Sequence, residues 1–175
     1  VNSVNGSEES LRTVLPIVKK YGASVVGLCM DEKGLPATAE ERIAIAKRIK
    51  AAANAIGIPD EDLWIDCLAL TVSAQQEQAR ETLKALRTVR YELGLTTVLG
   101  VSNISFGLPN RPLITQTFMV QALASGLTLP IINPNQKELM DAIAAHRVLC
   151  CEDSQCAAYV ARFAGDTGAP AAPKT

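Results

Sequence analysis

The chain has 175 residues, of which 48% are hydrophobic and 20% charged, so it has enough apolar material for one sizeable globular core. Its 17 basic and 18 acidic residues leave a formal net charge of −1, and we therefore expect no binding to nucleic acid or to an anionic membrane. No apolar run approaches the roughly 20 residues that a membrane helix requires. These features predict a cytoplasmic protein.

The chain opens with the end of an expected strand. Residues from Val1 to Asn5 predict that strand, with Asn2 at its tip, and the opening without methionine in the middle of a strand suggests a fragment. Ser7, followed by two acidic residues, is a good N-cap for a helix that runs to about Tyr21.

The next segment predicts a strand, a helix and another strand. Residues 23–29 form a continuous apolar run typical of a strand buried on both faces of a parallel sheet. Thr38 and Glu41 form a capping box for a helix that ends at Gly57. Residues 63–66 predict the next strand, which ends in a carboxylate.

The same alternation continues in the second half of the chain. Ser73 and Gln76 suggest a second capping box, for a helix that ends near residue 93, and residues 97–101 predict another strand. Pro112 suits the first turn of a further helix, which Gly126 ends.

The last elements complete a βαβαβαβαβα pattern. Residues 129–132 predict the fifth strand, Asn135 with Glu138 begins a closing helix, and residues 154–163 add a short one. Alternating strands and helices require a parallel sheet, so the fold class is α/β. Five strands are too few for a complete eight-stranded barrel. The sheet is therefore either an open doubly wound one or the C-terminal part of a barrel.

Polar residues stand at the carboxyl ends of the predicted strands, where both candidate folds place their sites. One carboxylate and several amides, without a nearby Lys or His, suit recognition of a flat heterocycle such as a pterin or a purine better than nucleophilic or metal catalysis. Alternatively, each polar residue only forms a turn. Arg111 in the following loop either lies exposed or pairs with a ligand carboxylate. The strand-end residues are Asn2, Met30, Asp31, Asp66, Ser102, Asn103 and Asn133.

The five cysteines are irregularly spaced, which argues against a secreted disulfide framework. Cys29 and Cys67 are expected to be small hydrophobic residues at strand ends. Three more follow His146 within ten residues, but their spacing lacks the paired CxxC pattern of zinc sites. We expect no metal held by this chain and reduced thiols at Cys150, Cys151 and Cys156.

Four segments together resemble the pterin-binding methyltransferase family. This family includes methyltetrahydrofolate:corrinoid/iron-sulfur protein methyltransferase and the folate domain of cobalamin-dependent methionine synthase. The resemblance runs in order over about residues 1–163, and the combination is specific whereas no single segment is. The segments are VNSVN (1–5), GLCMDEKGLP (27–36), PDEDLWIDCL (59–68) and GVSNISFGLPNRPLITQTFM (100–119).

The resemblance implies a TIM (β/α)8 barrel, of which this chain supplies about strand 4 to strand 8 and the closing helices. Residues 1–164 would form the pterin-binding domain and residues 165–175 a disordered tail. By similarity, Asn2 and Asp66 bind the pterin, Asn103 is a mobile pterin-binding residue, and Arg111 helps to hold the substrate. Further expected site residues are Gly100, Ser102 and Met30. The family also uses an Asp from its third strand, which no residue here matches, so the fragment alone should bind folate poorly.

The implied reaction moves the N5 methyl group of 5-methyltetrahydrofolate to cob(I)alamin. Asn103 would be the catalytic residue, because a hydrogen bond to N5 that strengthens as the methyl group leaves stabilises the transition state. The sequence shows no corrinoid-binding motif, so the corrinoid is expected on a partner protein or domain. The family also implies a homodimer.

Two alternatives stay open. Dihydropteroate synthase shares the barrel and the pterin pocket, but it has a Lys after its seventh strand and an Arg-x-His near its eighth. Here those positions hold residues 102–104 (Ser-Asn-Ile) and 132–134 (Ile-Asn-Pro). The second alternative is a pterin-binding fragment without catalytic activity.

Overall fold

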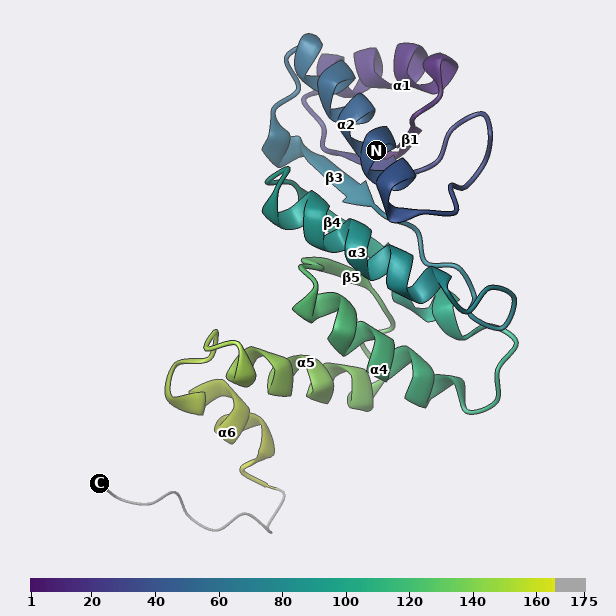
Figure 1. Ribbon diagram of the computed structural model, residues 1–175. Helices are drawn as coiled ribbons and strands as arrows, with labels where there is room; N and C mark the ends of the chain where they lie inside the picture. Colours follow the sequence, from purple (N-terminus) through teal and green to yellow (C-terminus); the bar gives the residue numbers. More distant parts are fainter. Residues whose placement is uncertain (166–175) are drawn as a thin grey trace. The chain divides into compact units, whose positions relative to one another are not determined.

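The computed structural model describes residues 1–165, which form an α/β structure (Figure 1). Strands and helices alternate along the chain, which confirms the predicted order of elements. Residues 166–175, nearly all of the expected tail, lie outside the described residues. The elements are β1 (Asn2–Asn5), α1 (Glu8–Tyr21), β2 (Val25–Leu28), α2 (Ala39–Ala55), η1 (Asp60–Asp62), β3 (Leu63–Asp66), α3 (Gln78–Tyr91), β4 (Thr96–Gly100), η2 (Val101–Ser105), α4 (Arg111–Ala124), β5 (Leu129–Ile131), α5 (Lys137–Leu149), η3 (Ser154–Cys156) and α6 (Ala157–Phe163).

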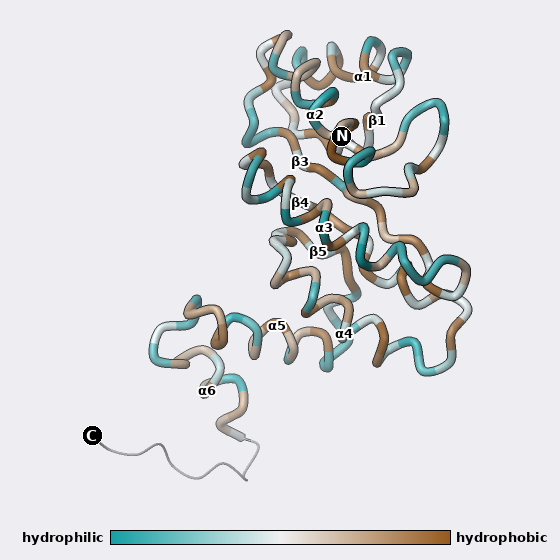
Figure 2. Tube along the Cα trace, in the orientation of Figure 1, coloured by the Kyte–Doolittle hydropathy of each residue, from teal (hydrophilic) through white to brown (hydrophobic). Residues whose placement is uncertain are grey.

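Local capping chemistry fixes several helix ends as predicted. The Ser7 hydroxyl accepts a hydrogen bond from the Ser10 N–H at 3.2 Å, and Gly22 ends α1 in the left-handed region at φ 58°. The capping box of Thr38 and Glu41 is formed at the start of α2. In Figure 2 these helices alternate between brown and teal along their length, as helices with one buried face do.

Two predicted helix starts are wrong. No capping box forms at Ser73 and Gln76, and α3 begins only at Gln78; the Ser73 side chain is directed to the loop after β4, where it donates to the carbonyl of Phe106. The closing helix α5 begins at Lys137 rather than at Asn135. Which partner a serine side chain turns toward depends on residues far along the chain, and local sequence does not reveal it.

The five strands form one parallel sheet in the order β1-β2-β3-β4-β5. Because the order never reverses, the sheet lacks the switch point of a doubly wound fold. Each helix from α1 to α4 contacts the next one along the chain. Successive parallel crossovers of one hand place their helices on one face of a sheet, so α1 to α4 form a single layer there.

The two faces of the sheet differ in their cover. Gly27 faces the helices, since a Cβ built on it would lie 3.1 Å from Ile49 of α2. Side chains alternate between faces along a strand, and paired residues of neighbouring strands share a face. We call the face away from α1–α4 the distal face; its residues are Asn2, Asn5, Val26, Leu28, Trp64, Asp66, Thr96, Val98, Gly100, Leu129 and Ile131. Leu129 and Ile131 are 39% and 55% exposed, so apolar surface lies open there.

The chain divides into two compact units, residues 1–133 and a second one that starts at Pro134. In the second unit, Asp141 of α5 accepts from Lys137 at 2.6 Å and from Arg162 of α6 at 2.7 Å, and the rings of Tyr159 and Phe163 lie 4.6 Å apart. Within residues 1–165, no helix is both long enough and apolar enough to cross a membrane.

Candidate functional site

Asp66 ends β3 on the distal face and is the most perturbed carboxyl group of that sheet. Its side chain is only 9% exposed, and burial raises the pKa of its carboxyl group to about 6. The Leu68 N–H donates to Asp66 Oδ1 at 2.8 Å, which opposes this shift but does not cancel it. A buried carboxyl group at a strand end whose pKa is raised to about 6 is a candidate for ligand recognition.

Asn103 lies on the same face, one strand away from Asp66. Asp66 pairs with Val98 of β4, and Gly100 follows two residues later, so Gly100 and Asp66 project to the same side. The Asn103 amide nitrogen lies 3.1 Å from the position that a Cβ on Gly100 would occupy. The amide therefore covers Gly100, with roughly 8 Å between the Cα atoms of Gly100 and Asp66 from ideal sheet spacings.

Asn2 also belongs to the distal face, but not to the tip of its strand as predicted. It opens β1 and pairs with Val26, whereas Asn5 ends the strand at the level of Asp66. The register shifts between Asn2 and Val4, which hydropathy alone does not reveal. Sheet spacings put the Cα atoms of Asn2 and Asp66 roughly 12 Å apart, which leaves room for a flat ligand between the side chains.

Arg111 braces the loop that carries Asn103. Its Nε donates to the Ser105 hydroxyl at 3.1 Å and its guanidinium to the Ser102 carbonyl at 3.3 Å. The guanidinium also lies over the Phe106 ring, 4.1 Å from its centroid. The sequence predicts either an exposed side chain or a ligand contact for Arg111. The structure adds a third role, because these contacts fix the turn η2 that carries Asn103.

The loops after β3 and β4 are bonded to each other. The hydroxyls of Thr71 and Ser73 both donate to the Phe106 carbonyl, and the Val72 N–H donates to the Ile104 carbonyl at 3.1 Å. Sequence analysis missed Thr71 and Ser73 as site-supporting residues: it assigned Ser73 to a capping box with Gln76 and did not single out Thr71. The hydrogen bonds couple the segment after Asp66 to the segment that holds Asn103.

The remaining candidates contribute through their backbone. Ser102 is exposed and its carbonyl accepts from Arg111 and from the Ser105 hydroxyl. Met30 is half-buried just beyond β2, and its carbonyl accepts the Gly6 N–H at 2.8 Å. Met30, Asp66, Gly100 and Asn103 therefore lie at the carboxyl end of the sheet, whereas Asn2 lies on the distal face at the start of β1.

The cysteines divide as the sequence predicts into buried and surface groups. Cys29 and Cys67 are fully buried, next to the ends of β2 and β3. Near α5, the Cys150 sulfur lies 3.5 Å from His146 Nε2. Within the described part of the chain, no three His, Cys, Asp or Glu residues gather in a way that could hold a metal ion.

The residues on the distal face can bind a flat polar ring. A carboxylate accepts paired N–H groups, and primary amides both donate and accept along a ring edge. The open apolar side chains of the same face offer stacking surface. Neither Lys nor His stands among these residues, so the arrangement suits binding and hydrogen-bond catalysis rather than nucleophilic chemistry.

The sequence matches the family of pterin-binding enzymes over residues 1–133, the whole of the first unit. Two methionine synthases are similar to it, from Mycobacterium leprae (strain TN) with 33% identity and from Mycobacterium tuberculosis (strain ATCC 25618 / H37Rv) with 32%. Each match covers 78% of this chain and 12% of the synthase.

A third relative is the methylcorrinoid:tetrahydrofolate methyltransferase of Eubacterium limosum, with 27% identity. That match covers 93% of this chain and 61% of the methyltransferase. The chain thus spans only part of each relative's length, so the similarity concerns the pterin-binding region and not the whole of each enzyme.

Proposed function

The chain belongs to the family of pterin-binding enzymes, and from this premise we propose that it carries the pterin site of a corrinoid methyltransferase. The reaction moves the N5 methyl group of 5-methyltetrahydrofolate to a cob(I)alamin held by a corrinoid protein or domain. The observation that carries the proposal is the placement of Asp66 and Asn103 on one face, at the carboxyl ends of adjacent strands. The names of the relatives support the choice of folate and corrinoid.

Asp66 is the proposed anchor of the pterin ring. Its ionised carboxylate would accept the ring N–H and the neighbouring exocyclic amino group, a pair of hydrogen bonds to a charged acceptor. The raised pKa means that burial makes ionisation of the Asp66 carboxyl group costly when no ligand is bound. Two hydrogen-bond donors from the ligand would stabilise the carboxylate and so favour the charged form. Asn2 would contact the ring from the β1 side.

Asn103 is the proposed catalytic residue. Its amide would donate a hydrogen bond to N5, and this bond strengthens as N5 gains electron density when the methyl group departs. An amide has no acidic proton at neutral pH, so it would stabilise the transition state, and the proton that N5 takes up as its bond to the methyl carbon breaks would come from solvent. Because the same bond serves the forward and reverse directions, the role holds for transfer to or from folate.

Gly100 and Arg111 would position Asn103. Gly100 leaves the space that the amide occupies, and Arg111 fixes the turn from which Asn103 projects. The corrinoid supplies the nucleophile when its carrier docks, and the chain's own part is to hold the methyl group in line with it.

We further propose that residues 1–164 belong to a TIM barrel, as its strands 4 to 8. An unreversed parallel order and a single helical layer are what a barrel wall shows, and the open apolar distal face would line the barrel interior. A homodimer and a cytoplasmic location complete the proposal. Free cysteines suit a reducing compartment, and light scattering on the purified protein tests the dimer.

The decisive experiment measures methyl transfer from 5-methyltetrahydrofolate to free cob(I)alamin, through the change in cobalamin absorbance. The proposal expects transfer by the intact protein that falls about a hundredfold in Asn103→Ala and is lost in Asp66→Ala. Folate binding without transfer would support a non-catalytic pterin module instead. In a separate assay with a dihydropterin diphosphate and p-aminobenzoate, formation of dihydropteroate and diphosphate would support the synthase alternative, which the absence of its Lys and Arg-x-His at residues 102–104 and 132–134 disfavours.

A further inference from the structure

Two side-chain hydroxyls hold one backbone carbonyl in the loop after β4. Thr71 and Ser73, whose hydroxyl oxygens lie 2.9 Å apart, both donate to the Phe106 carbonyl, which has two lone pairs to accept them. We call Thr71 and Ser73 the hydroxyl pair. Ser73 is exposed and Thr71 half-buried, so water could satisfy either hydroxyl if the loop lay elsewhere. The two hydrogen bonds therefore fix the place of the loop rather than satisfy buried groups.

The loop passes so close to the hydroxyl pair that it has room only for a glycine. Gly107 follows the held carbonyl with φ 77°, and a Cβ built on it would lie 2.8 Å from the Ser73 hydroxyl oxygen. A carbon atom and an oxygen atom that are not bonded to each other do not pack at that distance. The missing side chain is a second and independent observation that the two loops meet at this point.

A backbone hydrogen bond extends the contact toward the proposed catalytic residue. The Val72 N–H, between the two hydroxyls in the chain, donates to the Ile104 carbonyl at 3.1 Å. Ile104 is buried and directly follows Asn103. Figure 1 shows the segment between β3 and α3 running beside the loop that leads into α4. Residues 71–73 thus bond both η2 and the residue that follows it.

The same segment is fixed at its other end, next to Asp66. The Leu68 N–H donates to Asp66 Oδ1 at 2.8 Å, and the Leu68 carbonyl accepts from the buried side chains of Arg42 and Thr82. Only two residues separate Leu68 from Thr71, so little slack lies between the two fixed points. The segment therefore links the carboxyl group that would bind the pterin to the turn η2.

We infer that the hydroxyl pair positions the catalytic amide, because it fixes the distance between Asp66, which would anchor the ring, and Asn103, which would donate to N5. The inference rests on the proposed function and deepens it, since it names what sets the spacing of two groups from different strands. Arg111 holds η2 from the side of α4, whereas the hydroxyl pair holds it from the side of Asp66. Without the pair, Asn103 would be in line with N5 for a smaller share of the time.

The test removes both hydroxyls from the intact protein in the double variant Thr71→Val/Ser73→Ala. For methyl transfer from 5-methyltetrahydrofolate to free cob(I)alamin, we expect kcat to fall about tenfold while Kd for the folate changes less than about twofold. Either substitution alone leaves one donor and should lower kcat about threefold, which keeps the test available if the double variant does not fold. Thr71→Ser keeps both donors and should keep the unmodified rate.

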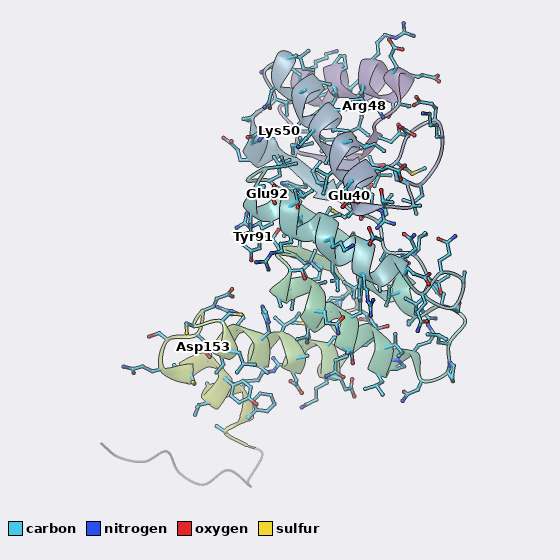
Figure 3. The ribbon with its side chains drawn as sticks, in the orientation of Figure 1. Glu40, Arg48, Lys50, Tyr91, Glu92 and Asp153 are labelled. Atoms are coloured by element: carbon cyan, nitrogen blue, oxygen red, sulfur yellow. The ribbon has the colours of Figure 1, made fainter. Side chains whose placement is uncertain are left out.

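Thr88→Val is the matched control, since it removes a hydroxyl of the same kind elsewhere. The Thr88 hydroxyl donates to Glu92 at 3.3 Å near the end of α3. Figure 3 labels Glu92 at the end of this helix that lies away from the loops after β3 and β4. The control should change neither kcat nor the affinity for 5-methyltetrahydrofolate.

Two further readouts separate positioning from a general loss of structure. In an Asn103→Ala background, removal of the hydroxyl pair should not lower kcat further, because the pair acts through that amide. Hydrogen exchange of the Val72 amide should be faster in the double variant, because the loop that carries its acceptor is no longer held.

A rate loss that persists in the Asn103→Ala background would overturn the inference, and so would an affinity that falls as much as the rate or an unchanged kcat. An unmodified protein that transfers no methyl group would contradict the proposed function instead. In that case the exchange of the Val72 amide still decides whether the hydroxyl pair holds the loop, and an unchanged exchange rate would refute it.

Discussion

The side chain of Asn103 lies folded over Gly100, with its amide nitrogen 3.1 Å from where a Cβ on that glycine would stand. The backbone of Gly100 has φ −74°, a value that any residue adopts, so the glycine is not needed for backbone freedom. It is needed for space. The Asn103 amide can therefore take this position only because Gly100 has no Cβ. Gly100 lies two residues after Val98, the residue of β4 that pairs with Asp66.

Gly100→Ala should therefore act on catalysis rather than on folding. The new methyl group would push the Asn103 amide by a few tenths of an ångström or into another rotamer, and the hydrogen bond to N5 would weaken. We expect kcat for methyl transfer to fall about tenfold or more, with little change in the thermal unfolding midpoint. Stopped-flow absorbance of cobalamin measures the rate.

A double-mutant cycle provides the control for that prediction. Asn103→Ala alone should lower kcat about a hundredfold, as the loss of a transition-state donor does. If Gly100→Ala acts through Asn103, the double variant should be no slower than Asn103→Ala alone. Additive losses would show that position 100 affects the site by another route.

Pterin binding should depend on pH through Asp66. The pKa of its carboxyl group is raised to about 6 by burial, and the ligand's N–H donors require the ionised form. Binding should be constant above about pH 7 and weaken below pH 6, approaching a tenfold loss for each further pH unit. Titrations between pH 5 and 8 at constant ionic strength measure this, and an affinity that stays flat across the range would contradict the role of Asp66.

Asp66→Asn should stabilise the protein while it abolishes binding. In the fold the carboxyl group binds its proton more tightly than in the unfolded chain, where its pKa is 3.8, so stability falls as pH rises from about 3.8 to about 6 and stays low above. The variant removes that cost, which is up to about 3 kcal/mol at pH 7. Urea unfolding should show a gain of about 1 kcal/mol at pH 4.5 and of about 3 kcal/mol at pH 7.

Asp60→Asn is the matched control for this stability change. A hydrogen bond from Lys50, 2.9 Å away, lowers the pKa of the Asp60 carboxyl group, so the shift has the opposite sign. Loss of that exposed charge should slightly destabilise the protein above pH 4 and never stabilise it. A gain in both variants would point to a general effect of charge removal.

Arg111→Ala should loosen the turn that carries Asn103. The substitution removes donors to Ser105 and Ser102 and the stacking on Phe106. We expect faster amide hydrogen exchange over residues 102–106 and a lower kcat for methyl transfer. The affinity for 5-methyltetrahydrofolate should change less. Arg87→Ala, which removes a similar stacking contact over Tyr91 on α3, should leave both unchanged.

Local signals predicted this fold well because each is read within a few residues. Ser7, Gly22 and the pair Thr38 and Glu41 all cap helices where the sequence placed them. The failures concern partners far along the chain. Ser73 bonds Phe106 rather than its own helix, and Asn2 stands three residues before the end of β1, in a register set by pairing with β2. The site residues were predicted by resemblance, whereas the cover of Asn103 over Gly100 required the structure.

Arg42 is the clearest case of a residue that sequence analysis passed over. A charged residue on a helix is normally exposed, yet Arg42 is fully buried. It donates to Thr82 at 2.8 Å, to the side chain of Gln78 and to the carbonyls of Pro36 and Leu68. One guanidinium thus joins α2 and α3 to the loops after β2 and β3.

Arg42→Met should destabilise the protein by about 3 kcal/mol or more, because it keeps the volume but leaves several buried acceptors without a donor. The urea midpoint should fall with an unchanged slope, and exchange of amides over residues 66–70 should quicken, since the Leu68 carbonyl loses a donor next to Asp66. Arg80→Met, at an exposed position of α3, should change stability by less than about 0.5 kcal/mol. Equal effects of the two substitutions would mean that Arg42 contributes only its hydrocarbon chain. Packing alone would then hold the loops after β2 and β3.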